Sequence, residues 1–149
     1  MTLRVNDADL ARIYAHGRAT YPEECCGVMI GSLEAGQQIV ISEVISAQNE
    51  RDDENRHNRF LISPQVLLSA QRRARENNMD VLGYYHSHPD HPARPSEFDR
   101  EHAWPGISYM IVSVAKGEVA DARSWRLVDD RSRFDEEDLI GENGELVTV

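Results

Sequence analysis

The sequence has few cysteines and no long apolar run. Its only cysteines are Cys25 and Cys26, and two neighbours in sequence rarely form a useful disulfide. We therefore predict reduced thiols and a cytoplasmic protein. No apolar stretch approaches the roughly 20 residues that a membrane-spanning helix needs. The first residues also lack the basic and apolar segments of a signal peptide, so we predict no membrane association.

Positive charge is scarce as well. The chain has 16 Lys and Arg against 26 Asp and Glu, which gives a net charge of −10 at pH 7. Such a surface repels nucleic acid, so we predict no nucleic-acid partner. The length of 149 residues predicts a single domain, residues 1–149, with an acidic C-terminal tail from about residue 129 to 149. Nothing in the sequence indicates an oligomeric state.

Three helices are predicted from the residues at their ends. The first covers about residues 7–19, because Asn6 or its neighbour can cap it. The second begins at Ser63, which is a good N-cap and is followed by a proline suited to the first helical position. A short third helix is expected over about residues 95–104, and a last helical turn near Glu136.

Segments rich in apolar and β-branched residues predict the strands, separated by turn residues. These segments are residues 25–33, 37–49, 59–63, 79–88 and 107–128, the last a hairpin. Residues 50–58 are charged and aperiodic, which predicts a surface loop. The irregular alternation, with hairpins towards both ends, predicts an α+β fold: a sandwich of helices on a mixed sheet.

The stretch from residue 83 to residue 99 concentrates side chains that do chemistry. It holds three of the chain's six histidines. Because residues i and i+2 of a strand point to the same face, His86 and His88 are expected to project together. Two adjacent imidazoles suit a first-row metal such as zinc. The alternative is that one imidazole is packed in the core while the other is solvated.

A third metal ligand is available a short distance downstream. Ser96 and Asp99 are spaced i and i+3 at the start of the third helix, so they share one face. An alternative needs no metal, because Ser96 can be the N-cap and Asp99 the third helical residue of a capping box. A hydroxyl can accept the capping bond and still donate its proton elsewhere, so the two interpretations are compatible.

Residues 86–99 read H-x-H, seven residues, then S-x-x-D, and this spacing resembles the signature of the JAMM, or MPN+, metalloproteases. That signature also expects an upstream glutamate. The stretch "YPEECCGVMIG" resembles the P-x-E-x-C-G segment that carries it, which selects Glu24 over its neighbour Glu23. The resemblance extends from the first helix to the "SWRLV" segment. It implies a cytidine-deaminase-like MPN/JAMM domain, which is an α/β sandwich with a mixed β-sheet flanked by helices.

The resemblance implies a role for each signature residue. His86, His88 and Asp99 would hold one zinc ion and leave its fourth position to water. Zinc would lower the pKa of that water towards about 7. Glu24 would be the general base that takes a proton from the water and returns it to the leaving amine. Ser96 would donate a hydrogen bond to the oxyanion of the tetrahedral intermediate.

The same resemblance implies the substrate. JAMM proteins cut amide or isopeptide bonds after the C-terminal Gly-Gly of ubiquitin-like proteins. The chain looks most like the compact prokaryotic members, including the peptidase that releases cysteine from a sulfur-carrier protein. We therefore expect a ubiquitin-like or sulfur-carrier protein as partner. Two alternatives stay open: an isopeptidase that removes ubiquitin-like modifiers from protein lysines, and a scaffold like the metal-free MPN relatives.

The remaining candidate residues have simpler interpretations. Cys25 or Cys26 as a nucleophile with a histidine base is an alternative, but the zinc ligands already account for the histidines. His91 is expected to be a loop side chain near the site, and Trp104 and Trp125 core or rim residues. Surface positions are predicted for the other histidines, His16, His57 and His102.

Overall fold

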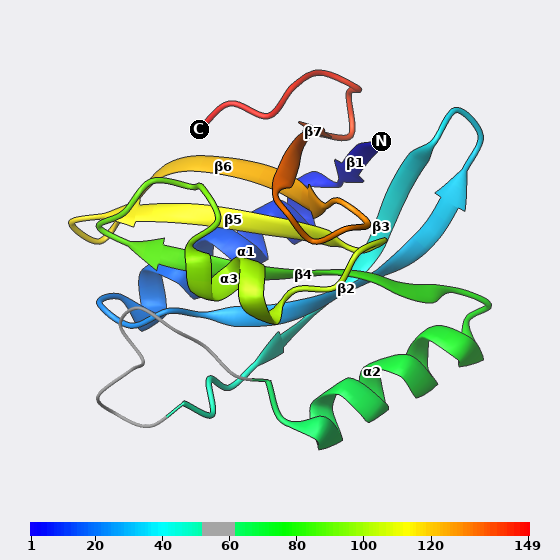
Figure 1. Cartoon of the computed structure of the whole chain (residues 1–149), viewed down its shortest axis with the longest axis horizontal. Coiled ribbons are helices and arrows are strands. Elements are labelled where there is room, and N and C mark those ends of the chain that lie inside the picture. The colour runs from blue at the N-terminus through cyan, green and yellow to red at the C-terminus, as the bar shows by residue number, and fades with distance from the viewer. Residues whose placement is uncertain (52–61) are drawn as a thin grey trace.

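The computed structural model of the chain describes residues 1–51 and 62–149 (Figure 1). Its elements are β1 (Thr2–Val5), α1 (Asp7–Thr20), β2 (Cys26–Glu34), β3 (Gln38–Ala47), α2 (Pro64–Glu76), β4 (Asp80–Pro89), α3 (Glu97–His102), β5 (Ser108–Ala115), β6 (Glu118–Leu127) and β7 (Phe134–Ile140). His57, most of the predicted charged loop and most of the predicted strand at residues 59–63 lie outside the described residues.

The strands close into a mixed barrel in the order β1-β3-β2-β4-β5-β6-β7. The predicted α/β sandwich, a mixed sheet flanked by helices, is therefore wrong. The error arises at the two ends of the chain. Residues 2–5 were not predicted to be a strand, and the predicted helical turn near Glu136 lies in β7. The short strand β1 pairs in parallel with both β3 and β7, with Leu3 opposite Ile39 and Leu139, and this double pairing closes the ring.

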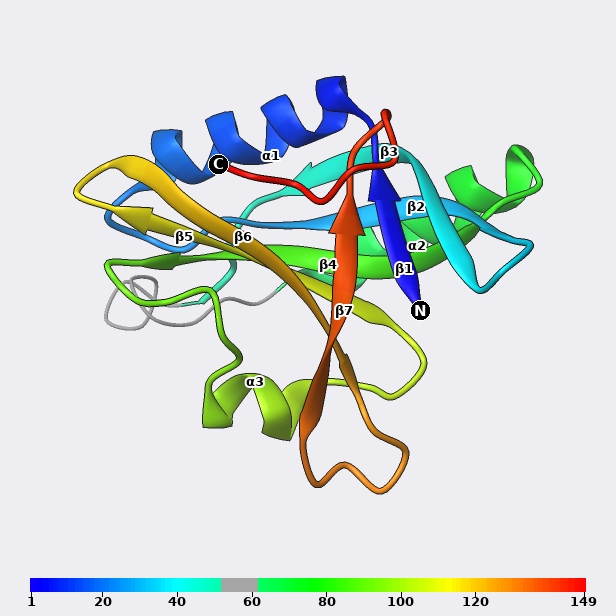
Figure 2. The same ribbon diagram turned by 90° about the horizontal axis from the view of Figure 1, so that it is seen from above.

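The helix starts follow the capping signals in the sequence. The Asn6 side chain accepts a hydrogen bond from the amide of Asp9 at the start of α1. Ser63 caps α2 in the same way and is followed by proline. Figure 2 shows α1 on one side of the strands and α3 on the other. Within the described residues, no helix combines the length and the apolar character needed to cross a membrane.

Alternation along β4 divides its side chains between two environments. Tyr85 is buried in an apolar cluster that includes Ile13 of α1. Tyr84 packs against a second apolar cluster, which includes Ala70 of α2. Because alternate residues of a strand share a face, His86 points to the same side as Tyr84. The fold thus presents the two predicted histidine ligands on the face of β4 that lies away from α1.

Close packing between β2 and β4 requires a glycine on the opposite face, which is turned towards α1. Gly27 lies opposite Tyr85 in the antiparallel pair. A β-carbon added to Gly27 would lie 2.1 Å from the Tyr85 ring, which is far inside van der Waals contact. The missing side chain of Gly27 therefore lets Tyr85 fill the space between the strand pair and α1. Close packing against Tyr85 therefore explains why a glycine follows Cys26 in the sequence motif.

Candidate metal centre

One carboxylate oxygen meets two imidazole nitrogens at the end of β4. The Oδ2 atom of Asp99 lies 3.3 Å from Nε2 of His86 and 3.1 Å from Nε2 of His88. The two Nε2 atoms are 3.2 Å apart. His86 is 1% and His88 8% exposed, so the cluster is shielded from bulk water. The structure therefore brings together all three predicted metal ligands.

The spacing of these three atoms suits a tetrahedral zinc ion. Zinc binds imidazole nitrogen and carboxylate oxygen at about 2.0–2.2 Å, and tetrahedral ligands at that radius are roughly 3.3–3.6 Å from one another. The observed separations of 3.1 to 3.3 Å come close to that value. Two imidazole nitrogens and one carboxylate oxygen are the donor types that zinc sites use, so these three side chains fit the ion.

Electrostatics favours the protonation state that binds a metal. Burial lowers the pKa of His86, which favours the neutral imidazole. Burial alone would raise the pKa of Asp99, but its interactions with His86 and His88 outweigh burial and hold that pKa well below the ordinary value. A neutral imidazole and an ionised carboxylate are the forms that coordinate zinc.

Glu24 reaches this face through the register of β2. Cys26 lies opposite His86 in the antiparallel pair, and paired residues point to the same face. Glu24 lies two residues before the start of β2, and its side chain is on the side of the two histidines. It is 2% exposed, whereas Glu23 is exposed. One donor atom from each of Glu24, His86 and His88 lies within 4.8 Å of the other two, so these three side chains are also close enough together to hold a metal ion.

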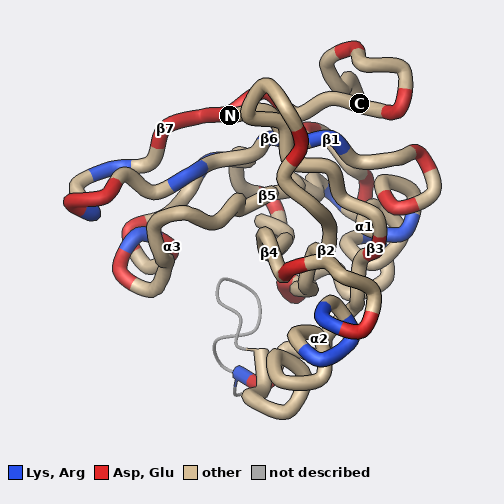
Figure 3. The backbone as a smooth tube through the Cα atoms, turned by 90° about the vertical axis from the view of Figure 1, so that its right-hand side faces the viewer, with Lys and Arg blue, Asp and Glu red and all other residues tan. Residues whose placement is uncertain are grey.

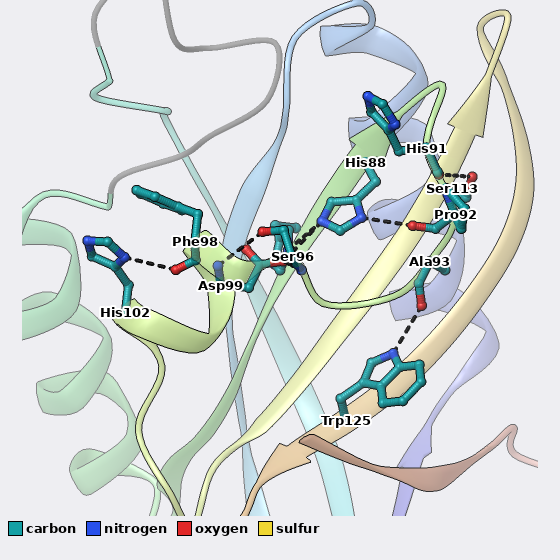
Figure 4. A network of polar contacts seen from close by, with 11 residues as sticks. His88, His91, Pro92, Ala93, Ser96, Phe98, Asp99, His102, Ser113 and Trp125 are labelled. Carbon is teal, nitrogen blue, oxygen red and sulfur yellow. Dashed lines mark hydrogen bonds and ion pairs between the residues drawn. The ribbon is translucent and has the colours of Figure 1, made fainter. Parts of the chain in front are cut away.

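Ser96 and Asp99 form a capping box at the start of α3, and the same box places the Asp99 carboxylate next to the two histidines. The Ser96 hydroxyl accepts from the Asp99 amide at 3.0 Å. The Ser96 amide in turn donates to Oδ2 of Asp99 at 2.8 Å, the same oxygen that faces both imidazoles. The cap thus fixes the orientation of the carboxylate, as Figure 4 shows. Ser96 itself is exposed.

A cavity of about 290 Å³ adjoins the candidate metal centre. His86 and Asp99 contribute to its wall, and most of the other residues that line it are apolar or aromatic. The aromatic residues are Tyr84, Phe98, Trp104, Tyr109 and Phe134. Trp104 is 66% exposed, which agrees with its expected place at a rim. The cavity can therefore accept an apolar part of a bound molecule next to the histidines.

Several of these cavity residues had no motif to identify them in the sequence. Tyr84 had one usable signal, because it precedes His86 by two residues on the same strand. Tyr109 is its partner across the parallel pair of β4 and β5. Phe134 lies in the segment whose strand was missed, and Arg51 lies next to residues outside the described range. These residues come together only through pairing and packing of distant segments.

The cysteines and the remaining described histidines lie outside the ligand set. Burial raises the pKa of Cys25 to about 11 and that of Cys26 to about 12, so both are thiols and poor nucleophiles at neutral pH. His91 is exposed in the loop after β4, as predicted. His102 stacks on Phe98, and the half-buried His16 contacts the Tyr85 hydroxyl at 2.8 Å, so His16 is less exposed than expected.

Charge is distributed unevenly around this region. Figure 3 shows basic residues gathered on α2 and acidic residues along β7. The exposed arginines of α2 are Arg72, Arg73 and Arg75. The same helix contributes Leu67 to the cavity wall. These arginines follow Leu67 by five to eight residues and are not among the residues that line the cavity, and Arg73 pairs with Glu43 instead.

Sequence comparison identifies a family. The family described as "Prokaryotic homologs of the JAB domain" matches residues 7–128. A Haloferax volcanii protein named "Desampylase" is 32% identical over 93 residues, which span 62% of this chain and 63% of that protein. A Pyrococcus furiosus protein of the same name is 28% identical over 80% of this chain and 76% of its own length.

Other relatives differ in name and extent. "Tail tip assembly protein K" of Escherichia phage N15 is 33% identical over 72% of this chain, but over only 39% of its own length. Two solution structures cover nearly the whole chain. A Salinibacter ruber protein is 36% identical with a TM-score of 0.72, covering 97% of this chain and 95% of its own. A Desulfitobacterium hafniense protein is 29% identical with a TM-score of 0.81, covering 97% and 94%.

Proposed function

The chain belongs to the family of prokaryotic homologs of the JAB domain, and from this membership we propose that it is a zinc-dependent hydrolase of the JAMM type. Its proposed substrate is an amide or isopeptide bond after the C-terminal Gly-Gly of a ubiquitin-like or sulfur-carrier protein. The observation that carries the proposal is the convergence of Asp99 Oδ2 on His86 and His88 at 3.3 and 3.1 Å.

The proposal assigns each residue a task that its position permits. His86, His88 and Asp99 hold the metal. When bound, zinc supplies an activated water and polarises the substrate carbonyl. Glu24, buried beside the histidines, accepts a proton and later delivers it to the leaving amine. Ser96 accepts the Asp99 amide through one lone pair and points its own proton at the developing oxyanion.

Two observations support an enzyme over a scaffold. The buried ligand set would be costly for a module without a metal, because polar groups withdrawn from water must be compensated. Two relatives also carry the enzyme name "Desampylase". The name of the phage relative refers to assembly, but the match covers a minor part of that protein. The cavity beside Asp99 supports a substrate with an apolar segment near its reacting bond.

The leaving group distinguishes the two enzymatic alternatives. A cysteine released from a sulfur-carrier protein is a small molecule, whereas an isopeptidase must also accommodate a second protein through its lysine. The names of the two relatives favour the isopeptidase. The short length of the chain and its resemblance to the cysteine-releasing peptidase favour release of cysteine from a sulfur-carrier protein. Both reactions use the same residues in the same roles.

One experiment tests the proposal. A carrier–cysteine adduct and a carrier–lysine conjugate are each incubated with the protein, and mass spectrometry identifies the products. Elemental analysis measures zinc in the same preparation. We expect one zinc per chain and cleavage after Gly-Gly in at least one substrate. Zinc-loaded protein that cleaves neither substrate, or protein that neither contains nor is activated by zinc, would contradict the proposed function.

A further inference from the structure

We propose that Trp125 and Ser113 are positioning residues that set the path of the chain between His88 and Asp99. Together with the second ring nitrogen of His88, they hold three consecutive backbone carbonyls of the loop after β4. The inference rests on the proposed zinc site, because His88 and Asp99 matter to function only as ligands. It concerns side chains that the JAMM signature does not include.

The contacts form an ordered series along the loop (Figure 4). The Ser113 hydroxyl donates to the carbonyl of His91 at 2.6 Å. The Nδ1 atom of His88 lies 2.8 Å from the carbonyl oxygen of Pro92. The indole N–H of Trp125 donates to the carbonyl of Ala93 at 3.0 Å. Each carbonyl in turn is therefore held by a side chain from β5, β4 and β6 respectively.

The loop has further anchors where it leaves β4. The Asp90 amide donates to the carbonyl of Val114 at 2.8 Å. The Asp90 carboxylate accepts from the Lys116 amide at 2.9 Å and from the Tyr21 hydroxyl at 2.6 Å. Backbone and side-chain bonds thus hold residues 90–93 against the strands. Only three peptide units connect Ala93 to Ser96, and they span at most roughly 11 Å. The start of α3 can therefore move only a short distance relative to Ala93.

This arrangement constrains both ligands. A hydrogen bond from Nδ1–H of His88 to the Pro92 carbonyl selects the tautomer whose Nε2 carries the lone pair towards the metal centre. The fixed path through Ala93 sets the position of the capping box, and therefore of the Asp99 carboxylate. Loss of the hydrogen bond to one of these carbonyls should allow Asp99 to move relative to His88. The consequence is a loosened ligand set in an otherwise intact barrel.

Trp125→Phe tests the inference because it keeps an aromatic ring and removes the N–H donor. We expect zinc affinity, measured by competition with a chromophoric chelator, to fall about 10- to 100-fold, the usual effect of losing a residue that orients ligands. The visible spectrum of the cobalt-substituted protein should change in band position or intensity. Trp104→Phe is the matched control for these metal measurements. The indole of Trp104 is exposed, and its substitution should leave affinity and spectrum unchanged.

Ser113→Ala and Ser113→Thr provide an independent pair. The alanine variant loses the donor to the His91 carbonyl and should weaken zinc binding about tenfold. The threonine variant keeps a hydroxyl and should restore most of the affinity. This pair decides the matter if metal-free Trp125→Phe fails to fold by circular dichroism. Zinc affinity within twofold of the native value in the folded donor-deleted variants would overturn the inference.

The outcomes separate this inference from the proposed function. If the native protein does not bind zinc, the metal site itself fails and the positioning role fails with it. If the native protein binds zinc and cleaves substrate while the donor-deleted variants bind equally well, only the positioning role fails. Amide hydrogen exchange of residues 90–96 in the metal-free proteins gives a readout that does not depend on activity. Faster exchange there in Trp125→Phe than in Trp104→Phe supports the inference.

Discussion

The hydroxyl of Ser87 accepts a hydrogen bond from the backbone amide of Cys25 at 2.8 Å. Ser87 lies between the two histidines on β4, and Cys25 directly follows Glu24. The Ser87 amide also donates to the Cys25 carbonyl at 3.2 Å, so Ser87 binds both the backbone amide and the backbone carbonyl of Cys25. On the other side, the Asn49 side chain donates to the Glu24 carbonyl at 3.2 Å. The backbone at Glu24 is thereby held from β4 and from the end of β3.

Ser87→Ala should therefore impair catalysis more than metal binding. The variant leaves the buried Cys25 amide without its acceptor, which costs about 1–3 kcal/mol of folding free energy. We expect roughly tenfold slower turnover with zinc content unchanged, and recovery in Ser87→Thr. Single-turnover cleavage and elemental analysis of the same samples measure both. Ser42→Ala, at an exposed position of β3, is the control. Native turnover in Ser87→Ala would show that this bond does not position Glu24.

Glu24→Gln should separate proton transfer from metal binding. The amide has nearly the shape of the carboxylate but cannot accept and return a proton. Turnover should fall about 10²–10⁴-fold while zinc, fold and affinity for a carrier ending in Gly-Gly are retained. Glu23→Gln should be close to neutral, because Glu23 is exposed and points the other way. Loss of zinc in Glu24→Gln would make Glu24 a ligand, and full activity would refute the general-base assignment.

Ser96→Ala should slow turnover without releasing zinc. Loss of one oxyanion donor typically costs about 2.7–4 kcal/mol in barrier, or roughly 10²–10³ in rate. The same substitution removes the helix cap, so the free energy of unfolding should fall by about 1 kcal/mol. Steady-state cleavage, zinc analysis and thermal unfolding distinguish the two effects. Ser63→Ala removes the cap of α2 and should lower stability with little loss of rate.

Removal of zinc should lower the thermal stability of the native protein. A ligand at 100 times its dissociation constant stabilises the folded state by about 2.7 kcal/mol, which corresponds to roughly 5–10 °C for a chain of this size. Unfolding scans with and without a chelator measure the shift. His88→Ala, and likewise His86→Ala or Asp99→Ala, should abolish the shift. His91→Ala should keep it, since that side chain is exposed and lies outside the ligand set. A full shift in all three ligand variants contradicts the ligand assignment.

Gly27→Ala should destabilise the barrel beneath the metal centre. The new β-carbon would lie 2.1 Å from the Tyr85 ring, so the ring or the strand must move. Overpacking of this kind typically costs about 1–3 kcal/mol. Gly141→Ala is the control, because its nearest new contact would be at 3.5 Å. Chemical denaturation of both variants measures the difference, and equal stability would show that Tyr85 relocates freely.

Local signals in the sequence predicted the helix starts and the residues that the metal centre brings together. The serine and proline at residues 63–64 begin α2 as expected, because a cap satisfies amides only a few residues away. Alternation along one strand sufficed to place His86 and His88 on a common face. The spacing of Ser96 and Asp99 predicted both a capping box and an approach to the histidines, and both are present in the structure. The assignment of a metal to these residues stays a prediction.

Tertiary structure decided everything that depends on pairing between distant segments. Closure of the barrel relies on β1 and β7, two short strands whose bonds join opposite ends of the chain, so neither had a local signal strong enough to identify it. The position of Glu24 beside the histidines depends on the register of β2 against β4, which the family motif indicated but no periodicity within β2 fixes. The loop contacts of Trp125 likewise exist only because β6 lies beside β5.

The sequence thus determined which side chains share a strand face or a helix cap, since those relations act over a few residues. The fold determined which of those faces meet, since strand pairing and burial act between residues that the sequence holds far apart.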